Sequence, residues 1–141
     1  MPSVKKQVLK QYCDAVGRGD IETVRSLVTD DYTHEFLGST VLAGKRELSE
    51  LLKQVEAFHA ALVSDAKFTL QEMAEEGDAL LGILKGEWEL RSGGKFAGIY
   101  AVSCRFEGDR LRGIRELMDT KLADSFLTGH DLAESRGGSP E

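Results

Sequence analysis

Two side chains whose types suit proton transfer stand in apolar stretches of the sequence. Glu116 alternates with Ile114 and Met118 near the end of the chain, and His34 lies between two aromatic residues in the segment DDYTHEF. Alternate residues of a strand share one face, so both groups are expected among apolar neighbours. A carboxyl or an imidazole in such a place can give or take a proton near neutral pH. Glu116 and His34 are therefore our first candidates for acid/base catalysis.

Each of these candidates also has a purely structural interpretation. Glu116 could point to solvent and pair with Arg112 or Arg115, as most charged strand residues do. His34 could be a hydrogen-bonded histidine of the core. The sequence leaves both alternatives open.

Lys85 and Glu87 are further candidates, and their direction depends on the turn at Gly93–Gly94. If the two glycines form a two-residue hairpin turn, Glu87 pairs with Tyr100. Lys85 then pairs with Val102. Both partners lie on the apolar side of their strand, and paired residues share a face, so both charged side chains point into the interior.

A register shifted by one residue gives the opposite result. Both charged side chains then face solvent, and the apolar residues of the same strand turn inward, namely Leu84, Trp88 and Leu90. The alternation of charged and apolar residues in ILKGEWELR favours this second register. Both registers remain open, and Lys85 and Glu87 stay in the predicted catalytic set.

Metal and cofactor chemistry have no signature in this sequence. The three histidines show no metal-binding spacing, and no glycine-rich nucleotide motif occurs. Cys13 and Cys104 show neither a metal-binding spacing nor a disulfide framework, so we expect two buried free thiols. We therefore predict no cofactor and no metal ion.

The apolar periodicity predicts three helices in the first half of the chain. A repeat of four over residues 4–16 indicates a first helix, which Ser3 caps and one of the next glycines ends. Asp20 caps a second, short helix. A third helix follows Gly44 and has one continuous apolar face.

Strands dominate the second half. From about Asp65 the apolar period changes to two, and turn residues at 76–78, 92–95 and 107–109 divide the segment into four strands. A further short strand lies in the segment DDYTHEF, where Tyr32, His34 and Phe36 share one side. We expect an α+β fold in which three N-terminal helices pack on a curved antiparallel sheet and leave a cavity between the layers.

The chain as a whole is predicted to be one domain. Residues 1–127 form the domain, with a last helical turn at 121–127, and residues 128–141 are expected to be a disordered tail. A net charge of −6 and a pI near 5.1 disfavour nucleic acid and anionic membranes as partners. With no apolar run of membrane-spanning length and a polar start, MPSVKKQVLK, the expected compartment is the cytoplasm.

Two segments resemble a known superfamily. Residues 8–52, VLKQYCDAVGRGDIETVRSLVTDDYTHEFLGSTVLAGKRELSELL, and residues 109–120, DRLRGIRELMDT, are similar to the first half and the last strand of nuclear transport factor 2-like proteins, in their SnoaL-like and ketosteroid isomerase-like branch. The resemblance implies a cone-shaped, cystatin-like barrel with an internal pocket. It does not fix the function, because this fold carries several unrelated activities.

Comparison with ketosteroid isomerase argues against that activity. The resemblance places Tyr12 at the tyrosine of the oxyanion hole. Phe36 stands where the isomerase has its general-base aspartate, and Val102 stands where it has a neutral aspartic acid. Because proton transfer between carbon atoms needs the carboxylate base, we expect no steroid isomerase of this design.

Limonene epoxide hydrolase offers a second comparison. Its last-strand acid corresponds to Glu116. If the turn at Gly93–Gly94 has two residues, the resemblance places Lys85 and Glu87 at the arginine and the aspartate that work with this acid. It also places His34 at a tyrosine that orients water. A lysine lacks the planar fork with which an arginine holds two carboxylates.

We predict a cofactor-independent enzyme that acts by acid/base catalysis on a small, mostly apolar metabolite. The reaction types are isomerisation, cyclisation or epoxide opening. The residues expected to line its pocket are Tyr12, Phe36, Phe58, Tyr100, Val102 and Met118. The alternative is a non-catalytic member of the same fold that binds a small molecule or has a structural role. The resemblance also implies a homodimer formed through the convex face of the sheet.

Overall fold

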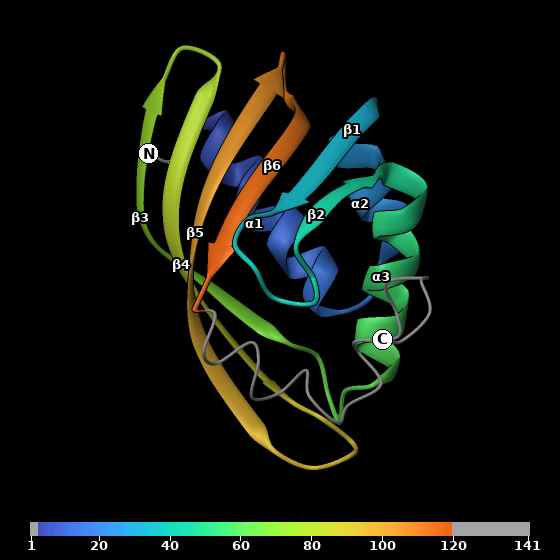
Figure 1. Ribbon diagram of the computed structural model, residues 1–141. Helices are drawn as coiled ribbons and strands as arrows, with labels where there is room; N and C mark the ends of the chain where they lie inside the picture. The colour runs from blue at the N-terminus through green and yellow to red at the C-terminus, as the bar shows by residue number, and fades with distance from the viewer. Residues whose placement is uncertain (1–2, 120–141) are drawn as a thin grey trace.

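A computed structural model gives the fold and describes residues 3–119 (Figure 1). The predicted helical turn at 121–127, the tail at 128–141 and the domain boundary between them lie outside the described residues. Along the chain the elements are α1 (Val4–Gly17), α2 (Ile21–Leu27), β1 (Val28–Phe36), β2 (Gly44–Glu47), α3 (Leu48–Ala60), β3 (Lys67–Glu76), β4 (Ala79–Glu89), β5 (Lys95–Glu107) and β6 (Arg110–Met118).

The first two helices begin at the caps that the sequence predicts. The Ser3 hydroxyl accepts a hydrogen bond from the backbone N–H of Lys6 at 3.2 Å. The Asp20 carboxylate accepts one from the N–H of Thr23 at 3.1 Å. Each cap satisfies a backbone donor that has no partner inside the helix. Gly17 is the last residue of α1, as predicted.

The short strand β2 is an element that the sequence analysis missed. It pairs antiparallel with β1 and places Arg46 opposite His34. Helix α3 follows at once, and Glu47 and Glu50 cap its start reciprocally. A strand of four residues is too short for an alternation of polar and apolar residues to reveal it.

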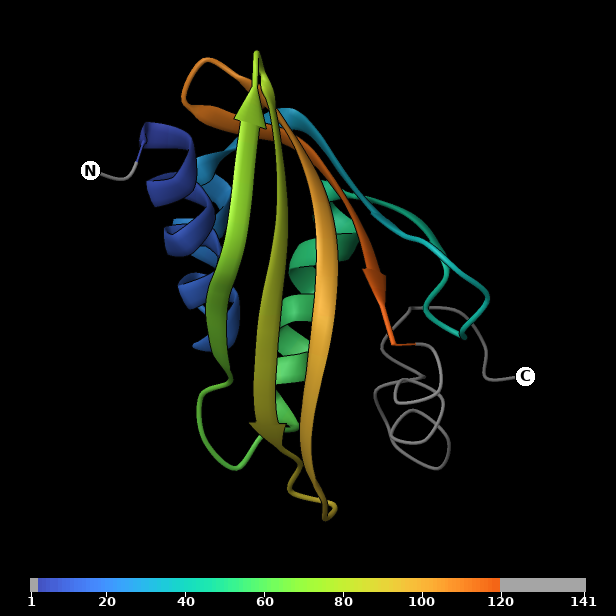
Figure 2. The ribbon, with the colours of Figure 1, turned by 90° about the vertical axis from the view of Figure 1, so that its left-hand side faces the viewer.

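The strands form one curved sheet with the order β2-β1-β6-β5-β4-β3. The predicted α+β class is confirmed, but the sheet is mixed rather than antiparallel, because β1 runs parallel to β6. Its two edges, β2 and β3, do not pair, so the sheet is open and not a closed barrel. The three helices all cover the concave face, as two perpendicular views show (Figures 1 and 2). No helix among the described residues is long and apolar enough to cross a membrane.

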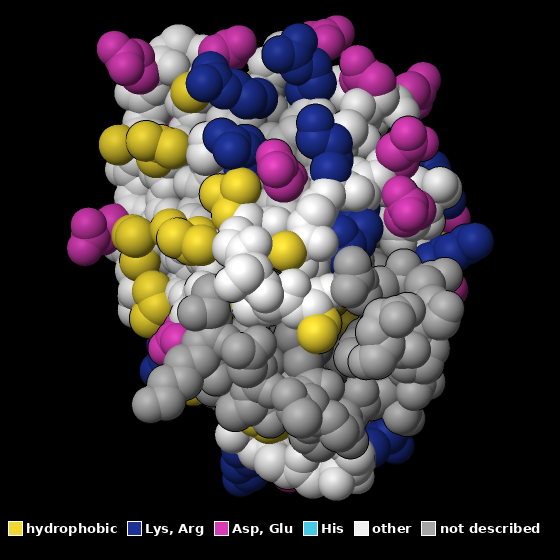
Figure 3. All heavy atoms as spheres, in the orientation of Figure 1, with side chains coloured by type: hydrophobic (Ala, Val, Ile, Leu, Met, Phe, Trp, Pro, Cys, Tyr) yellow, Lys and Arg dark blue, Asp and Glu magenta, His cyan; other side chains and the backbone are white. Residues whose placement is uncertain are grey.

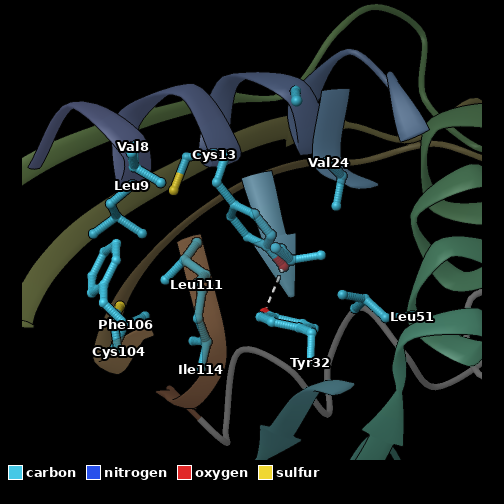
Figure 4. Close-up of a cluster of buried hydrophobic side chains, with 14 of the residues drawn as sticks. Val8, Leu9, Cys13, Val24, Tyr32, Leu51, Cys104, Phe106, Leu111 and Ile114 are labelled. Carbon is cyan, nitrogen blue, oxygen red and sulfur yellow. Dashed lines mark hydrogen bonds between the residues drawn. The ribbon is translucent and has the colours of Figure 1, made fainter. Parts of the chain in front are cut away.

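The core lies between the helices and the concave face. Side chains of α1, Leu9 and Cys13 among them, point toward Leu111 and Ile114 of β6 (Figure 4). A second buried cluster includes Trp88 and Leu90 of the β4–β5 hairpin. The two clusters leave between them the space that becomes the candidate site.

The pairing of β4 with β5 is shifted by three residues from the two-residue-turn register, since Glu87 lies opposite Ala97 rather than Tyr100. Side chains therefore face as the second interpretation expects, although the shift is larger than one residue. Glu89 pairs with Lys95 and Leu84 with Tyr100, so the loop is longer than a two-residue turn. The segment after α3 binds the end of β4, since the backbone N–H of Val63 donates a hydrogen bond to the carbonyl of Glu89 at 2.9 Å. This register buries Trp88 and Leu90, to 6% and 2% exposure, which a Gly-Gly two-residue turn would not.

Candidate active site

A cavity of about 150 Å³ lies between the helices and the concave face of the sheet. Its wall is almost wholly apolar. All six residues that the sequence predicts for the pocket line it, and so do Glu116 and His34. The other lining residues are Leu9, Cys13, Val16, Leu42, Leu51, Gln54, Val55, Phe68, Leu84, Trp88 and Ile114.

Glu116 and His34 meet because β1 and β6 are parallel neighbours. In this register Phe36 lies beside Glu116, and His34 lies beside Ile114, so both polar side chains are on the concave face. The His34 Nε2 atom is 2.6 Å from Glu116 Oε1. The side chains of His34 and Glu116 are only 5% and 14% exposed. The outward arrangement of Glu116 is therefore excluded, and the one carboxyl among the described cavity residues is bonded to an imidazole.

Two buried tyrosines extend this contact into a chain of hydrogen bonds. The Tyr32 hydroxyl lies 2.8 Å from His34 Nδ1. The Tyr12 hydroxyl lies 3.0 Å from that of Tyr32, the contact dashed in Figure 4. Burial raises the pKa of both phenols well above the usual value, so both remain protonated donors at neutral pH.

The chain of hydrogen bonds has a consistent direction when the imidazole is neutral. Tyr12 donates to Tyr32, and Tyr32 donates to His34 Nδ1. This leaves the proton of the ring on Nε2, which donates to a carboxylate oxygen of Glu116. The reverse direction, with a protonated Glu116 donating to Nε2, satisfies the same four groups. The arrangement can therefore hold Glu116 in either protonation state and at a fixed orientation.

Arg46 supports the wall of the cavity on the side of β2. Its side chain is buried, its guanidinium lies 5.1 Å from the centre of the Phe36 ring, and its Nη2 donates to the carbonyl of Leu42 at 2.8 Å. Phe36 and Leu42 both line the cavity. A buried cation held on an aromatic face thus fixes two lining residues.

Lys85 and Glu87 are not brought to the cavity, and their predicted inward direction is corrected here. Their partners across the hairpin are Ile99 and Ala97, which lie on the convex face. The concave face of β4 carries Leu84 and Trp88 instead. A shift of the pairing by an odd number of residues moves every side chain of a strand to its other face. The observed register is favoured because it buries Trp88.

Tyr32, Gln54 and Trp88 are site residues that the sequence analysis did not select. Tyr32 shares the face of His34 at a distance of two residues, which is a signal that was present in the sequence. Gln54 lies three residues after Leu51 and four before Phe58, on the buried face of α3. The inward direction of Trp88 depends only on the register of the hairpin between β4 and β5.

The two cysteines are free and buried, as predicted. Burial, and secondly the charge of Glu116, raises the pKa of the Cys104 thiol to about 12. The pKa of Cys13, which lines the cavity, is also raised by burial. Both thiols are therefore protonated at neutral pH and are poor nucleophiles. Within residues 3–119, no group of three His, Cys, Asp or Glu side chains is arranged to hold a metal ion.

Comparison with known proteins finds a matching family and several structures with a similar fold. The model of the SnoaL-like domain family matches residues 9–114. A candidate polyketide cyclase from Acidithiobacillus ferrooxidans is 20% identical, with a TM-score of 0.73 over 92% of this chain and 99% of that one. PrhC from Penicillium brasilianum is 15% identical, with a TM-score of 0.79 over 95% and 96% of the two chains.

A third similar structure is an LEH-like epoxide hydrolase from M. tuberculosis. It is 13% identical, with a TM-score of 0.72 over 89% of this chain and 91% of that one. At these identities the likeness concerns the fold alone. Comparison with curated proteins gives no significant match.

Proposed function

The chain belongs to the family of SnoaL-like domains, and from this premise we propose that its cavity is the active site of a cofactor-independent acid/base enzyme. The substrate is a small, mostly apolar metabolite. The observation that carries the proposal is the 2.6 Å contact between His34 and Glu116 at the wall of an otherwise apolar cavity. A carboxyl that faces such a cavity and is held by an imidazole has the parts of a general acid or base.

In the proposed reaction Glu116 takes a proton from one atom of the substrate and returns it to another. As a carboxylate it accepts the proton on one oxygen, while the other oxygen stays within reach of His34. His34 and Tyr32 act as positioning residues, since they hold the carboxyl through hydrogen bonds. The proton never leaves the cavity, so the net reaction is an isomerisation, or a cyclisation in which a proton is lost and regained.

The number of carboxyls favours isomerisation or cyclisation over epoxide opening. The resemblance to the hydrolase requires two acids with water between them, and it assigns the role of the second acid to Glu87. Glu87 does not line the cavity. Among the described residues that line the cavity, Glu116 is the only acid. It stands between Phe36 and Val102, its partners on the two neighbouring strands. The resemblance to the isomerase implies a carboxyl at each of these two positions. In this chain both positions are apolar, and the cavity carboxyl, Glu116, is on β6 between them.

A panel of small cyclic ketones, enones and epoxides tests the proposal. The chain has a single tryptophan, Trp88, and it lines the cavity, so its fluorescence reports occupancy independently of turnover. We expect at least one compound to change this fluorescence and to be converted to an isomer detectable by gas chromatography with mass spectrometry. Binding throughout the panel without any product would contradict the enzyme proposal.

A non-catalytic ligand-binding protein is the second candidate. The observation that favours it is the closed chain of hydrogen bonds, in which Tyr12, Tyr32, His34 and Glu116 satisfy one another without a ligand. Such a network can serve stability alone. The same panel separates the two candidates, because this one predicts the fluorescence change and no product.

We also propose that the chain forms a homodimer through the convex face of its sheet. Leu81, Ile83, Ile99 and Leu117 are 36–57% exposed on this face. Ile83, Ala101 and Leu117 form one row across β4, β5 and β6. Hydrophobic side chains gather over these strands in Figure 3. Such apolar patches commonly mark protein interfaces.

Light scattering after size-exclusion chromatography checks this proposal. We expect twice the mass of the 15.5 kDa chain for the wild type. The variant Ile83→Lys should give the monomer mass, because it places a charge within this apolar row. A monomeric wild type would contradict the proposal.

A further inference from the structure

Gln54 is a buried polar side chain with no hydrogen-bond partner among the described residues. It is 8% exposed and lines the cavity from α3. Its Oε1 atom is fully buried and makes no hydrogen bond. Its neighbours on the same face of the helix, Leu51 and Val55, are apolar and also line the cavity. The amide therefore stands alone in an apolar wall.

An unpaired amide in this place is unfavourable for the free protein. A buried polar group that lacks a partner loses its hydration and gains nothing in return, and a leucine of similar size would avoid this loss. Nearly all buried polar groups in folded proteins are paired. An exception that lines a cavity indicates that the partner is supplied by whatever fills the cavity.

Gln54 and Glu116 face the cavity from different layers of the fold. Glu116 belongs to β6 in the sheet, whereas Gln54 belongs to α3, which covers the concave side (Figure 2). The other residues of the wall are mostly apolar. A ligand in this cavity thus meets one acid/base group on the sheet side and one neutral amide on the helix side.

We propose that Gln54 binds a second polar group of the substrate, remote from the group that reacts at Glu116. The substrate is then a neutral molecule with an apolar ring, a reacting carbonyl or alkene end, and a hydroxyl or carbonyl at the opposite end. Engineered protein cavities of about 150 Å³ hold benzene, which sets the size at roughly one ring. An amide presents both a donor and an acceptor, so either polar group suits it.

This inference rests on the proposed function for the orientation of the ligand, but its test needs no turnover. The probes are 4-(hydroxymethyl)cyclohexanone and 4-ethylcyclohexanone, which differ by a hydroxyl in place of a methyl group. The dissociation constant of each is measured by Trp88 fluorescence with the wild type and with Gln54→Leu. We expect Gln54→Leu to lower the preference for the hydroxyl compound by about tenfold, because it removes the hydrogen bond.

A second readout covers the free protein. Without ligand, Gln54→Leu should unfold at a higher temperature than the wild type, because it removes an unpaired amide from an apolar wall. Gln71→Leu, which changes an exposed residue of β3, is the matched control and should leave the ligand preference unchanged.

Three results overturn the inference. They are an equal ligand preference in wild type and Gln54→Leu, a lower unfolding temperature for Gln54→Leu, and no binding of either ketone to the wild type. The proposed enzyme activity fails by a different result, namely binding that depends on Gln54 with no product from any compound. A Gln54 effect without turnover therefore leaves the inference standing and removes the enzyme.

Discussion

The substitution Glu116→Gln is expected to lower kcat of the substrate found in the panel by about 10²–10⁴-fold, the usual contribution of a general acid or base. Glutamine keeps the size of the side chain and can still bond to His34, so the fold should persist. It cannot take a proton at neutral pH. The measurement is the initial rate over a range of substrate concentrations up to saturation, which gives kcat and KM. We expect KM to change little, because the apolar wall supplies most of the binding.

Glu87→Gln is the matched control for this prediction. It makes the same chemical change, and Glu87 lies on β4 of the same sheet but faces away from the cavity. Its kcat should equal that of the wild type. Equal losses in both variants would mean that net charge or stability, rather than the cavity carboxyl, sets the rate. A full rate for Glu116→Gln would remove this residue from catalysis.

The substitution Gly17→Ala is expected to lower the free energy of unfolding by about 1–3 kcal/mol, as overpacking of a buried position does. A Cβ atom on Gly17 would lie 2.3 Å from the carbonyl oxygen of Ala66. The two backbones cannot separate freely, because the N–H of Ala66 donates to the Gly17 carbonyl at 2.9 Å. This contact ties the end of α1 to the segment before β3.

Urea unfolding measures this effect, and Gly82→Ala is the control. At Gly82 the nearest heavy atom to an added Cβ is 3.3 Å away, so a smaller loss is expected. Because α1 carries Tyr12 and Cys13 on the cavity wall, Gly17→Ala should also weaken ligand binding measured by Trp88 fluorescence. A Gly17→Ala protein as stable as the wild type would show that α1 is not held at this point.

Much of the fold could be predicted because its signals are local. Ser3 and Asp20 cap their helices by contacts with residues three positions away. A change of apolar period from four to two marks the start of β3. The parallel pairing of β1 with β6 could not be found in this way. It joins residues about eighty positions apart, and no local pattern records the relative direction of two distant strands.

The candidate site divides along the same line. Glu116 and His34 were selected from their own apolar neighbours, and the structure brings them together. The direction of Lys85 and Glu87 depends on the exact length of the loop between β4 and β5. The glycines at 93 and 94 suggest a two-residue turn, whereas burial of Trp88 and Leu90 favours the longer loop that is observed. Gln54 was passed over because a single amide on a helix carries no sign of whether it finds a partner.

Deuterium incorporation into 4-ethylcyclohexanone tests most directly whether the cavity carboxyl moves protons. The ketone is incubated in D₂O at neutral pD with wild type, Glu116→Gln or no protein, and exchange at the carbons beside the carbonyl is followed by mass spectrometry. We predict that the wild type exchanges these hydrogens well above the rate without protein and that Glu116→Gln does not. A wild-type rate equal to the rate without protein, or equal rates for both proteins, would contradict the assignment of Glu116 as the acid/base group.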